Sequence, residues 1–324
     1  MMCSGASCGT AKVDKLKKCP EGNNADIKLA KGTKSDVVPC SIDECQKDQS
    51  PKQEDEEACE KRAVITDDVD VLLYNALPDD VLFKQPESSY LGDCPICLIP
   101  LALNEGAWKV YGCCSKTVCN GCNFINQRRE YEQKLEHACP FCRHLLPKSN
   151  AEDKRNIKRR INANDPLALC NSGAQCLNDK KFKTAFKLLS KAAELGDVTA
   201  HFNLSIMYSL GQVEKDREKH LYHLEQGSIG GHPSARYNLG NYEWVYGDKE
   251  RAKKHYMISA SLGCDDTIRW LMHAFKKGKV SKEYLAVALR AHQAAVNATK
   301  SPQREEAEEA MKRYGEDFDG YSDY

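Results

Sequence analysis

Eight cysteines within 49 residues have the spacing expected of metal ligands. Six of them form three C-x-x-C pairs, and the other two are adjacent in the chain. A C-x-x-C turn can place two thiolates on one metal, and zinc takes four such ligands in a tetrahedral arrangement. The pattern therefore predicts two zinc ions held by eight thiolates. The predicted ligands are Cys94, Cys97, Cys113, Cys114, Cys119, Cys122, Cys139 and Cys142.

Other chemistry for these cysteines fits the chain less well. The first residues lack the apolar core of a signal peptide, and no run of about 18 apolar residues suggests a membrane-spanning helix. We therefore expect a cytoplasmic or nuclear protein, whose thiols stay reduced and bind metals. The odd total of 17 cysteines argues against a fully paired disulfide framework. A redox C-x-x-C needs a thioredoxin-like strand and helix, which the surrounding sequence does not suggest.

The elements that position these ligands must come from a short segment, residues 91–147. A segment of this size buries too little apolar surface to be stable alone. Structural zinc contributes about 10–16 kcal/mol in small fingers, which is comparable to the net stability of a whole domain. We therefore expect metal to organise this fold. Between the second and third C-x-x-C pairs, Phe124, Tyr131 and Leu135 recur at helical spacing, which predicts a helix with these residues in the core.

The order of the cysteines resembles that of RING domains. In that family, the first and third ligand pairs hold one metal, and the second and fourth pairs hold the other. The resemblance implies a first zinc site formed by Cys94, Cys97, Cys119 and Cys122. The second site then includes Cys114, Cys139 and Cys142.

The fourth ligand of the second site departs from the typical RING pattern. Lys116 stands where a typical RING has histidine, and a protonated lysine cannot ligate zinc. RING variants that use cysteines throughout have four residues between their fourth and fifth ligands, as this chain does. Cys113 is then the remaining ligand, but adjacent side chains can share a metal only in a turn. His137 and His144 are nearby substitutes.

The resemblance also implies a ubiquitin ligase. RING domains dock a ubiquitin-conjugating enzyme and hold its thioester-linked ubiquitin in a reactive pose, which is catalysis by orientation. Ile96 and Pro140, inside the first and last C-x-x-C pairs, correspond to the family's docking surface. Arg143 corresponds to an arginine that bridges the conjugating enzyme and ubiquitin, a task that suits its rigid five-donor fork. The alternatives are a core residue for Ile96, a solvated charge for Arg143, and a zinc-stabilised adaptor without ligase activity.

From Asp165 onward the sequence repeats itself. The predicted repeats begin at Asp165, Asp197, His232 and Asp265, at intervals of 32, 35 and 33 residues. A period of this length marks a helix–turn–helix solenoid. The motifs resemble SEL-one-like repeats, relatives of tetratricopeptide repeats, over residues 165–300. The resemblance implies a concave surface that recruits a protein substrate or scaffold.

Three aromatic residues of the third repeat have two possible roles. Tyr237, Tyr242 and Trp244 can line the binding surface of the solenoid, or they can form the core between repeats. We favour the core, because large aromatic side chains at helical spacing usually serve packing.

The remaining segments are mostly polar. Residues 1–62 and the acidic end of the extension 301–324 have few large apolar residues, so we expect both to be disordered. Residues 63–90 are a linker with apolar clusters, expected to form either a short helix that packs on the next module or a linear docking motif. Residues 148–164 are a basic helical linker, for which a solvated face is favoured over a nuclear localisation signal or a nucleic-acid contact.

The composition fits these predictions. The formal net charge is zero, and nucleic-acid binding by the overall field needs a basic excess, so we do not expect nucleic acid as a partner. The predicted fold is a small zinc-bound α+β module of the RING type followed by an all-α helical-repeat solenoid, with a disordered N-terminal arm and C-terminal tail.

Overall fold

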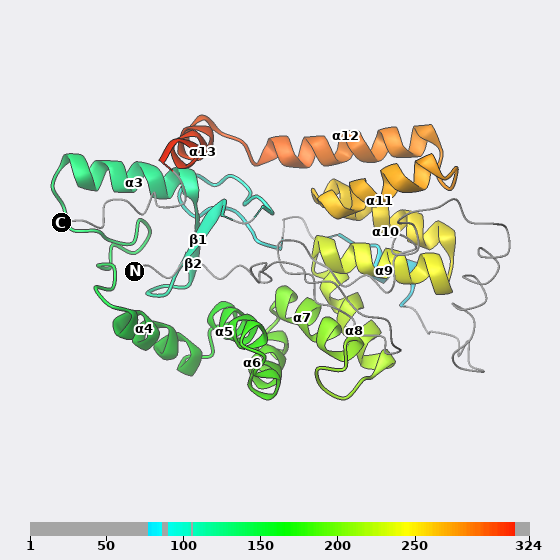
Figure 1. Cartoon of the computed structure of the whole chain (residues 1–324), viewed down its shortest axis with the longest axis horizontal. Helices are drawn as coiled ribbons and strands as arrows, with labels where there is room; N and C mark the ends of the chain where they lie inside the picture. The colour runs from blue at the N-terminus through cyan, green and yellow to red at the C-terminus, as the bar shows by residue number, and fades with distance from the viewer. Residues whose placement is uncertain (1–76, 86–89, 105, 315–324) are drawn as a thin grey trace, which may run out of the picture.

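The computed structural model describes residues 77–85, 90–104 and 106–314. The disorder predicted for residues 1–62 and for the acidic tail lies outside these residues. Figure 1 shows a small cysteine-rich module, which contains the sheet and α3, beside a curved array of paired helices from α5 to α12. The last helix, α13, returns to the module and packs on α3, so the two parts meet again at the end of the described chain.

The cysteine-rich module has one small sheet and one helix. β1 (Trp108–Tyr111) and β2 (Lys116–Cys119) form an antiparallel hairpin in which each residue of β1 pairs with one of β2. α3 (Asn120–Glu132) follows β2 directly. Leu101 and Val118 are buried in a single small cluster together with several of the cysteines. Cysteine side chains are therefore part of the core of the module.

α4 (Asn150–Asn162) occupies the basic linker. The side chain of Ser149 caps it by accepting a hydrogen bond from the backbone N–H of Glu152. Acidic residues lie in its first turn and basic residues in its last turn, as the helix dipole favours. Most of its basic side chains are exposed, but Arg160 is half-buried and contacts the cysteine-rich module.

The rest of the described chain is helical, which confirms the predicted solenoid-like array. α5 packs on α6, α7 on α8 and α9 on α10, and each pair contacts the next. α12 packs on α10 and α11. The helices are α5 (Pro166–Asn178), α6 (Phe182–Glu194), α7 (Val198–Ser209), α8 (Arg217–Ile229), α9 (Pro233–Tyr246), α10 (Lys249–Ser261), α11 (Asp265–Lys276), α12 (Lys282–Ala298) and α13 (Pro302–Tyr314).

Each of the first three repeats begins with a side chain that caps a helix. Asp165, Asp197 and His232 each accept a hydrogen bond from the backbone N–H three residues later. In the fourth repeat the same backbone conformation occurs at Cys264, so the predicted start at Asp265 is wrong by one residue. The side chain of Cys264 makes no capping hydrogen bond, because a thiol is a weak acceptor. The sequence predicted Asp265 instead, because an aspartate also begins the first two repeats.

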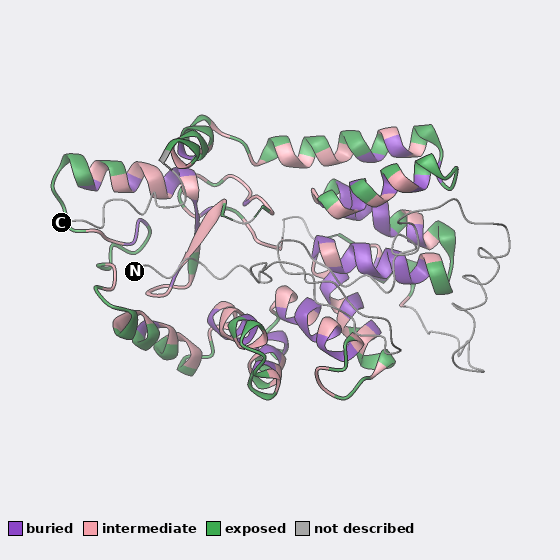
Figure 2. Ribbon diagram, in the orientation of Figure 1, coloured by how far each residue is buried: buried purple, intermediate pink, exposed green. Residues whose placement is uncertain are grey.

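The three aromatic residues of the third repeat belong to the core. Tyr237 and Tyr242 are buried, and Trp244 packs against Tyr256 and Trp270. Figure 2 shows that buried positions concentrate in α7 to α10, whereas α12 and α13 are exposed along much of their length. Burial of side chains is therefore greatest at the centre of the array.

The short helix α2 (Asp79–Leu82) precedes the cysteine-rich module in sequence but packs on the repeats. Leu82 is fully buried in a cluster with Phe202, Leu224 and Leu239. The expectation that the linker 63–90 packs on the next module is therefore wrong for residues 77–85, and residues 63–76 and 86–89 lie outside the described residues. The apolar pattern predicted burial, but not which surface provides it.

Candidate metal centre

The first cysteine cluster joins the loop before the hairpin to the start of α3. Its members are Cys94, Cys97, Cys119 and Cys122, whose Sγ atoms lie within 4.8 Å of one another. Cys119 ends β2 and caps α3 by accepting a hydrogen bond from the backbone N–H of Cys122. All but Cys97 are buried. This cluster can hold one metal ion.

The second cysteine cluster joins the hairpin turn to the last C-x-x-C loop. Its members are Cys113, Cys114, Cys139 and Cys142, whose Sγ atoms also lie within 4.8 Å of one another. The turn between β1 and β2 is closed by hydrogen bonds from the backbone N–H groups of Cys114 and Ser115 to the carbonyl of Tyr111. Because the two adjacent cysteines stand in this turn, both reach the same cluster. It can hold a second metal ion.

The candidate substitutes for Cys113 lie outside the second cluster. Nδ1 of His137 lies 3.1 Å from the buried carboxylate of Glu130, and His144 is exposed. Lys116 is exposed as well, with its Nζ 5.9 Å from the ring centre of Phe141. Among the described residues, the groups suited to a metal therefore contain cysteines alone.

Sulfur-to-sulfur distances fit tetrahedral metal sites rather than disulfides. The distances are 3.8 Å for Cys97 and Cys119, 3.8 Å for Cys114 and Cys139, and 3.5 Å for Cys113 and Cys142. A disulfide brings two sulfurs to about 2.05 Å. Four sulfurs at about 2.3 Å from a central zinc ion lie about 3.8 Å apart along the tetrahedral edges. Both clusters therefore have the dimensions of a four-thiolate zinc site.

The clustered thiols shift one another's pKa values in opposite directions. Hydrogen bonding from Cys119 lowers the pKa of Cys94 to about 4, whereas burial raises the pKa of Cys122 to about 12. In the second cluster, hydrogen bonding from a neighbouring thiol lowers the pKa of Cys139 to about 5, and burial raises that of Cys114 to about 12. Ionisation of one thiol disfavours ionisation of the neighbouring thiols, because like charges at these distances repel. A divalent cation lets all four thiolates coexist.

The first and last C-x-x-C loops adopt the same turn. In each, the residue after the second cysteine has a left-handed backbone, Leu98 at φ 56° and Arg143 at φ 62°. Its N–H donates to the carbonyl of the first cysteine of the pair. Ile96 in the first loop therefore corresponds to Phe141 in the last, and both are exposed.

The three candidate docking residues differ in exposure. Ile96 is 42% exposed, so it offers apolar surface to a partner. Arg143 is exposed, and its Nη1 donates to Oδ1 of Asn126 on α3 over 3.0 Å. Pro140 is buried and offers little surface of its own. The structure thus presents Ile96 and Arg143 to solvent and places Pro140 within the loop.

The sequence predicted the wrong face of α3 as core. Tyr131 is 57% exposed, and Leu135 lies beyond the end of the helix and is also exposed. Phe124 is half-buried. Apart from the ligand candidate Cys122, the buried side chains of α3 are polar: Asn126 donates to the carboxylate of Glu130 over 2.7 Å. Helical spacing correctly predicted α3, but hydropathy does not reveal the hydrogen-bonded polar side chains on its buried face.

An arginine from α13 contacts the first cysteine cluster. Nη2 of Arg304 lies 3.5 Å from Sγ of Cys97, and the same guanidinium donates to the carbonyls of Ile99 and Pro100 over 2.9 and 2.6 Å. Burial is the largest single influence and lowers the pKa of Arg304, but the hydrogen bonds and charges of Cys97 and Cys119 together raise the pKa overall. Gly121 permits this approach, because a Cβ there would lie 2.8 Å from the backbone N of Arg304.

A second arginine, on α4, contacts the second cluster. Nε and Nη2 of Arg160 donate to the carbonyl of Cys113 over 3.2 and 2.6 Å. Sequence reasoning missed both arginines. Arg304 is 207 residues from Cys97, and Arg160 ends a basic run for which a solvated face was favoured over a nuclear localisation signal or a nucleic-acid contact. Contacts of this kind orient ligands and strengthen metal sites.

Comparisons with known proteins found a structural likeness but no sequence family. No protein-family model matches the sequence, and no curated protein matches it. The chain is similar to the crystal structure of a Sel1 repeat protein from Oxalobacter formigenes, with 19% sequence identity and a TM-score of 0.40. The similarity covers 54% of this chain and 59% of that one, so the chain spans less than two thirds of that protein. Every helix among the described residues is too short or too polar to cross a membrane.

Proposed function

We propose that the chain is a zinc-binding ubiquitin ligase of the RING type. In this proposal the cysteine-rich module docks a ubiquitin-conjugating enzyme, and the helical repeats recruit a protein substrate or scaffold. The observation that carries it is the crossed order of the ligands: the first and third pairs meet in one cluster, and the second and fourth pairs meet in the other. This order is the one expected from the resemblance to RING domains.

Zinc is the metal that this donor set favours. Four thiolates in a tetrahedron suit Zn²⁺ or an iron–sulfur site, and the separation into two groups of four fits one zinc ion in each. Each cluster fills all four positions with protein ligands, which is typical of structural rather than catalytic zinc. The module therefore contributes rigidity and orientation, and the covalent chemistry belongs to the docked conjugating enzyme.

Ile96 and Arg143 are the residues of this module proposed to act on the partners. The exposed side chain of Ile96 provides the apolar contact with the conjugating enzyme, next to a rigid metal loop. Arg143 is oriented by its hydrogen bond to Asn126, and its remaining donors are free to bridge enzyme and ubiquitin. Pro140, being buried, supports the shape of the last loop instead of adding contact surface.

In vitro ubiquitination with a panel of ubiquitin-conjugating enzymes tests the proposal. Ile96→Ala and Arg143→Ala are each expected to lower autoubiquitination at least about 10-fold, a loss of about 1.4 kcal/mol in the orientation of the partners. Both variants should retain two zinc ions per chain. Matched controls are Tyr131→Ala, an exposed aromatic side chain on α3, and Arg155→Ala, an exposed arginine on α4.

Each contrary result points to a different failure. A zinc-loaded chain that is inactive with every conjugating enzyme would favour a zinc-stabilised adaptor that joins partners without ligase activity. Full activity in both variants would contradict the roles of Ile96 and Arg143. One metal per chain would contradict the crossed two-site arrangement.

A further inference from the structure

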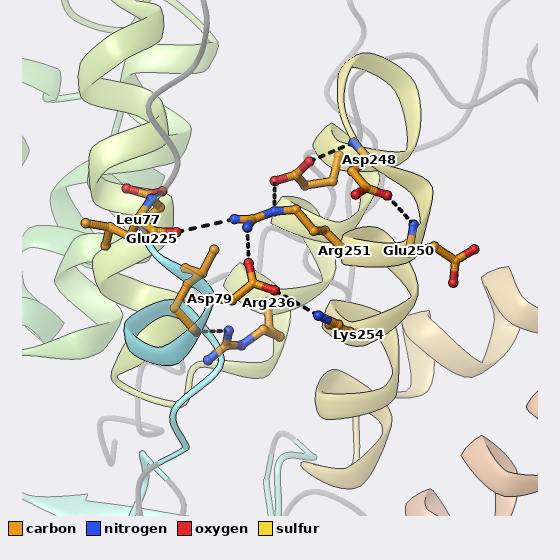
Figure 3. A network of polar contacts seen from close by, with 10 residues as sticks. Leu77, Asp79, Glu225, Arg236, Asp248, Glu250, Arg251 and Lys254 are labelled. Atoms are coloured by element: carbon orange, nitrogen blue, oxygen red, sulfur yellow. Dashed lines mark hydrogen bonds and ion pairs between the residues drawn. The ribbon is translucent and has the colours of Figure 1, made fainter.

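The segment 77–85 lies against three helices of the repeats, with α2 between α8 and α10 (Figure 3). Leu82 is fully buried and packs with Leu224 of α8 and Leu239 of α9. The ring of Phe83 lies 4.6 Å, centre to centre, from the ring of His255 on α10. We call this contact region the α2 site. It comprises Leu224, Arg236, Leu239, Arg251, Lys254 and His255.

The polar side of the α2 site presents two cations to an acidic residue of the segment, and one of them, Arg251, also pairs with Glu243 of α9. Asp79 pairs with Arg251 and with Lys254, whose Nζ lies 2.8 Å from Oδ2 of Asp79. The hydrogen bond from Lys254 is the main cause that lowers the pKa of Asp79. The same two cations lie 5.5 and 5.0 Å from the ring centre of Phe83. One pair of cations therefore recognises an acid and an aromatic ring four residues apart.

A buried arginine recognises the backbone of the segment. Arg236 is fully buried, and its Nη1 and Nη2 donate to the carbonyls of Leu82 and Ser228, each over 2.6 Å. Burial lowers its pKa to about 10, and no carboxylate among the described residues forms an ion pair with it. A buried cation is costly unless its donors are satisfied. The α2 site is thus built to receive a chain that presents a carbonyl at this position.

The contacts of segment 77–85 are transferable to another peptide. They require an acid, a leucine three residues later, an aromatic residue next, and the carbonyl of the leucine. α2 is a single turn of four residues, too short to be stable as an isolated helix, so its conformation depends on the surface it contacts. Recognition by anchors at fixed spacing along one turn is how short helical peptides bind.

We propose that the α2 site binds partner proteins through a short acidic segment of the form Asp-x-x-Leu-Phe, and that segment 77–85 occupies it as a competitor built into the chain. The inference rests on the recruiting role proposed for the repeats and states the chemistry of the recruited partner. A tethered segment acts at an effective concentration of about millimolar for a short linker. A partner therefore binds well only when its segment outcompetes the one in the chain.

A fluorescein-labelled peptide with the sequence of residues 77–85 tests this with the full-length, zinc-loaded chain. The unmodified chain is expected to bind it weakly. The double variant Leu82→Ala and Phe83→Ala, which removes the competing anchors, is expected to bind it at least about 10-fold more tightly. The single variant Asp79→Lys weakens the tethered segment at an exposed position, and it provides the same comparison if the double variant does not fold.

A charge exchange then tests specificity. In the Leu82→Ala and Phe83→Ala background, where the tethered segment competes little, Lys254→Glu should lose affinity for the unmodified peptide and regain it for a peptide that carries Asp79→Lys. Lys249→Glu, an exposed lysine of the same helix outside the α2 site, is the matched control and should leave both affinities unchanged. Equal affinities of the Lys254→Glu chain for the two peptides would overturn the proposed recognition.

Two other results would overturn the proposal. The first is equally weak binding by the unmodified chain and by folded variants with both metals. The second is a dimer, detected by sedimentation velocity, that dissociates in the double variant, because the segment would then be exchanged between two copies. The assay contains neither conjugating enzyme nor ubiquitin, so its failure leaves the ligase proposal standing, and an inactive ligase leaves the peptide result intact.

Discussion

The two cysteine clusters place the same four-thiolate chemistry in different surroundings. In the first, three of the four cysteines are buried, and Cys119 also caps α3. In the second, Cys139 is buried, but Cys142 is exposed and the other two are half-buried in the hairpin turn. The first cluster is therefore part of the core of the module, whereas the second lies at its edge.

The arginine at the first cluster also makes a more direct contact with the cysteine ligands than the arginine at the second cluster does. Arg304 contacts a ligand sulfur as well as two backbone carbonyls of the first loop. Arg160 contacts only the backbone carbonyl of Cys113. The first cluster is thus coupled to α13 and the second to α4. The helices α13 and α4, on either side of the repeats in sequence, therefore contact the two clusters, and α13 contacts its cluster more directly.

Loss of a ligand should have the largest effect, and the effect should differ between clusters. Cys94→Ser removes a fully buried ligand, and a bound structural zinc is worth about 10–16 kcal/mol, so we expect the module to unfold and lose both metals. Cys142→Ser removes an exposed ligand, and we expect the first zinc to remain. Zinc per chain, measured by native mass spectrometry, should be near zero for the first variant and near one for the second.

Cys176→Ser is the control for these substitutions, because Cys176 lies in α5, away from both clusters. It should keep two metals. If Cys94→Ser and Cys142→Ser had the same zinc content, the clusters would be equally important to the fold and the comparison would fail.

Chelation should separate the two metals by rate. Cys142 is open to solvent, so a chelator can attack the second site directly, whereas the first requires local opening of the core. With excess chelator and a colorimetric zinc indicator, we expect two phases of equal amplitude that differ at least about 10-fold in rate, corresponding to about 1.4 kcal/mol of opening free energy. A single phase would contradict the difference in protection.

Removal of the arginine contacts should have a smaller effect. Substitution of groups that orient metal ligands typically lowers metal affinity by about 10- to 100-fold. We expect Arg304→Ala to fall in this range at the first site and to accelerate the slow chelation phase. Arg160→Ala, which removes only a carbonyl contact, should have a weaker effect, confined to the fast phase. Arg155→Ala is the control, and an equal effect of all three would show that general charge matters rather than these contacts.

Sequence reasoning identified the elements that have a strong local pattern. The helix repeats follow from repeat starts such as Asp165 and Asp197, and the resemblance to RING domains implied the first group of four cysteines and three members of the second. Three features depend on tertiary contact and could not be found this way. They are the placement of Leu82 on the repeats, the approach of Arg304 to Cys97, and the polar interior of α3.

The hairpin turn at Cys113 shows where spacing and geometry must be combined. Spacing left Cys113, His137 and His144 as alternatives for one ligand position. The turn places Cys113 in the second cluster, because Ser115 has a left-handed backbone at φ 54° and its N–H closes the turn onto Tyr111. Only that local fold brings two adjacent thiols to one cluster.

The smallest effect should come from restoring the histidine that a typical RING has at position 116. Lys116 is exposed, and the second cluster already has four sulfur ligands without it. Tetrahedral zinc has no fifth position to fill in a closed site, so Lys116→His should leave two metals per chain and the fast chelation rate unchanged. In the Cys113→Ser background the same histidine is expected to restore the second metal, measured by native mass spectrometry. If Lys116→His alone slowed the fast phase, Cys113 would be a weak ligand and the second cluster would be a three-thiolate site in need of a partner.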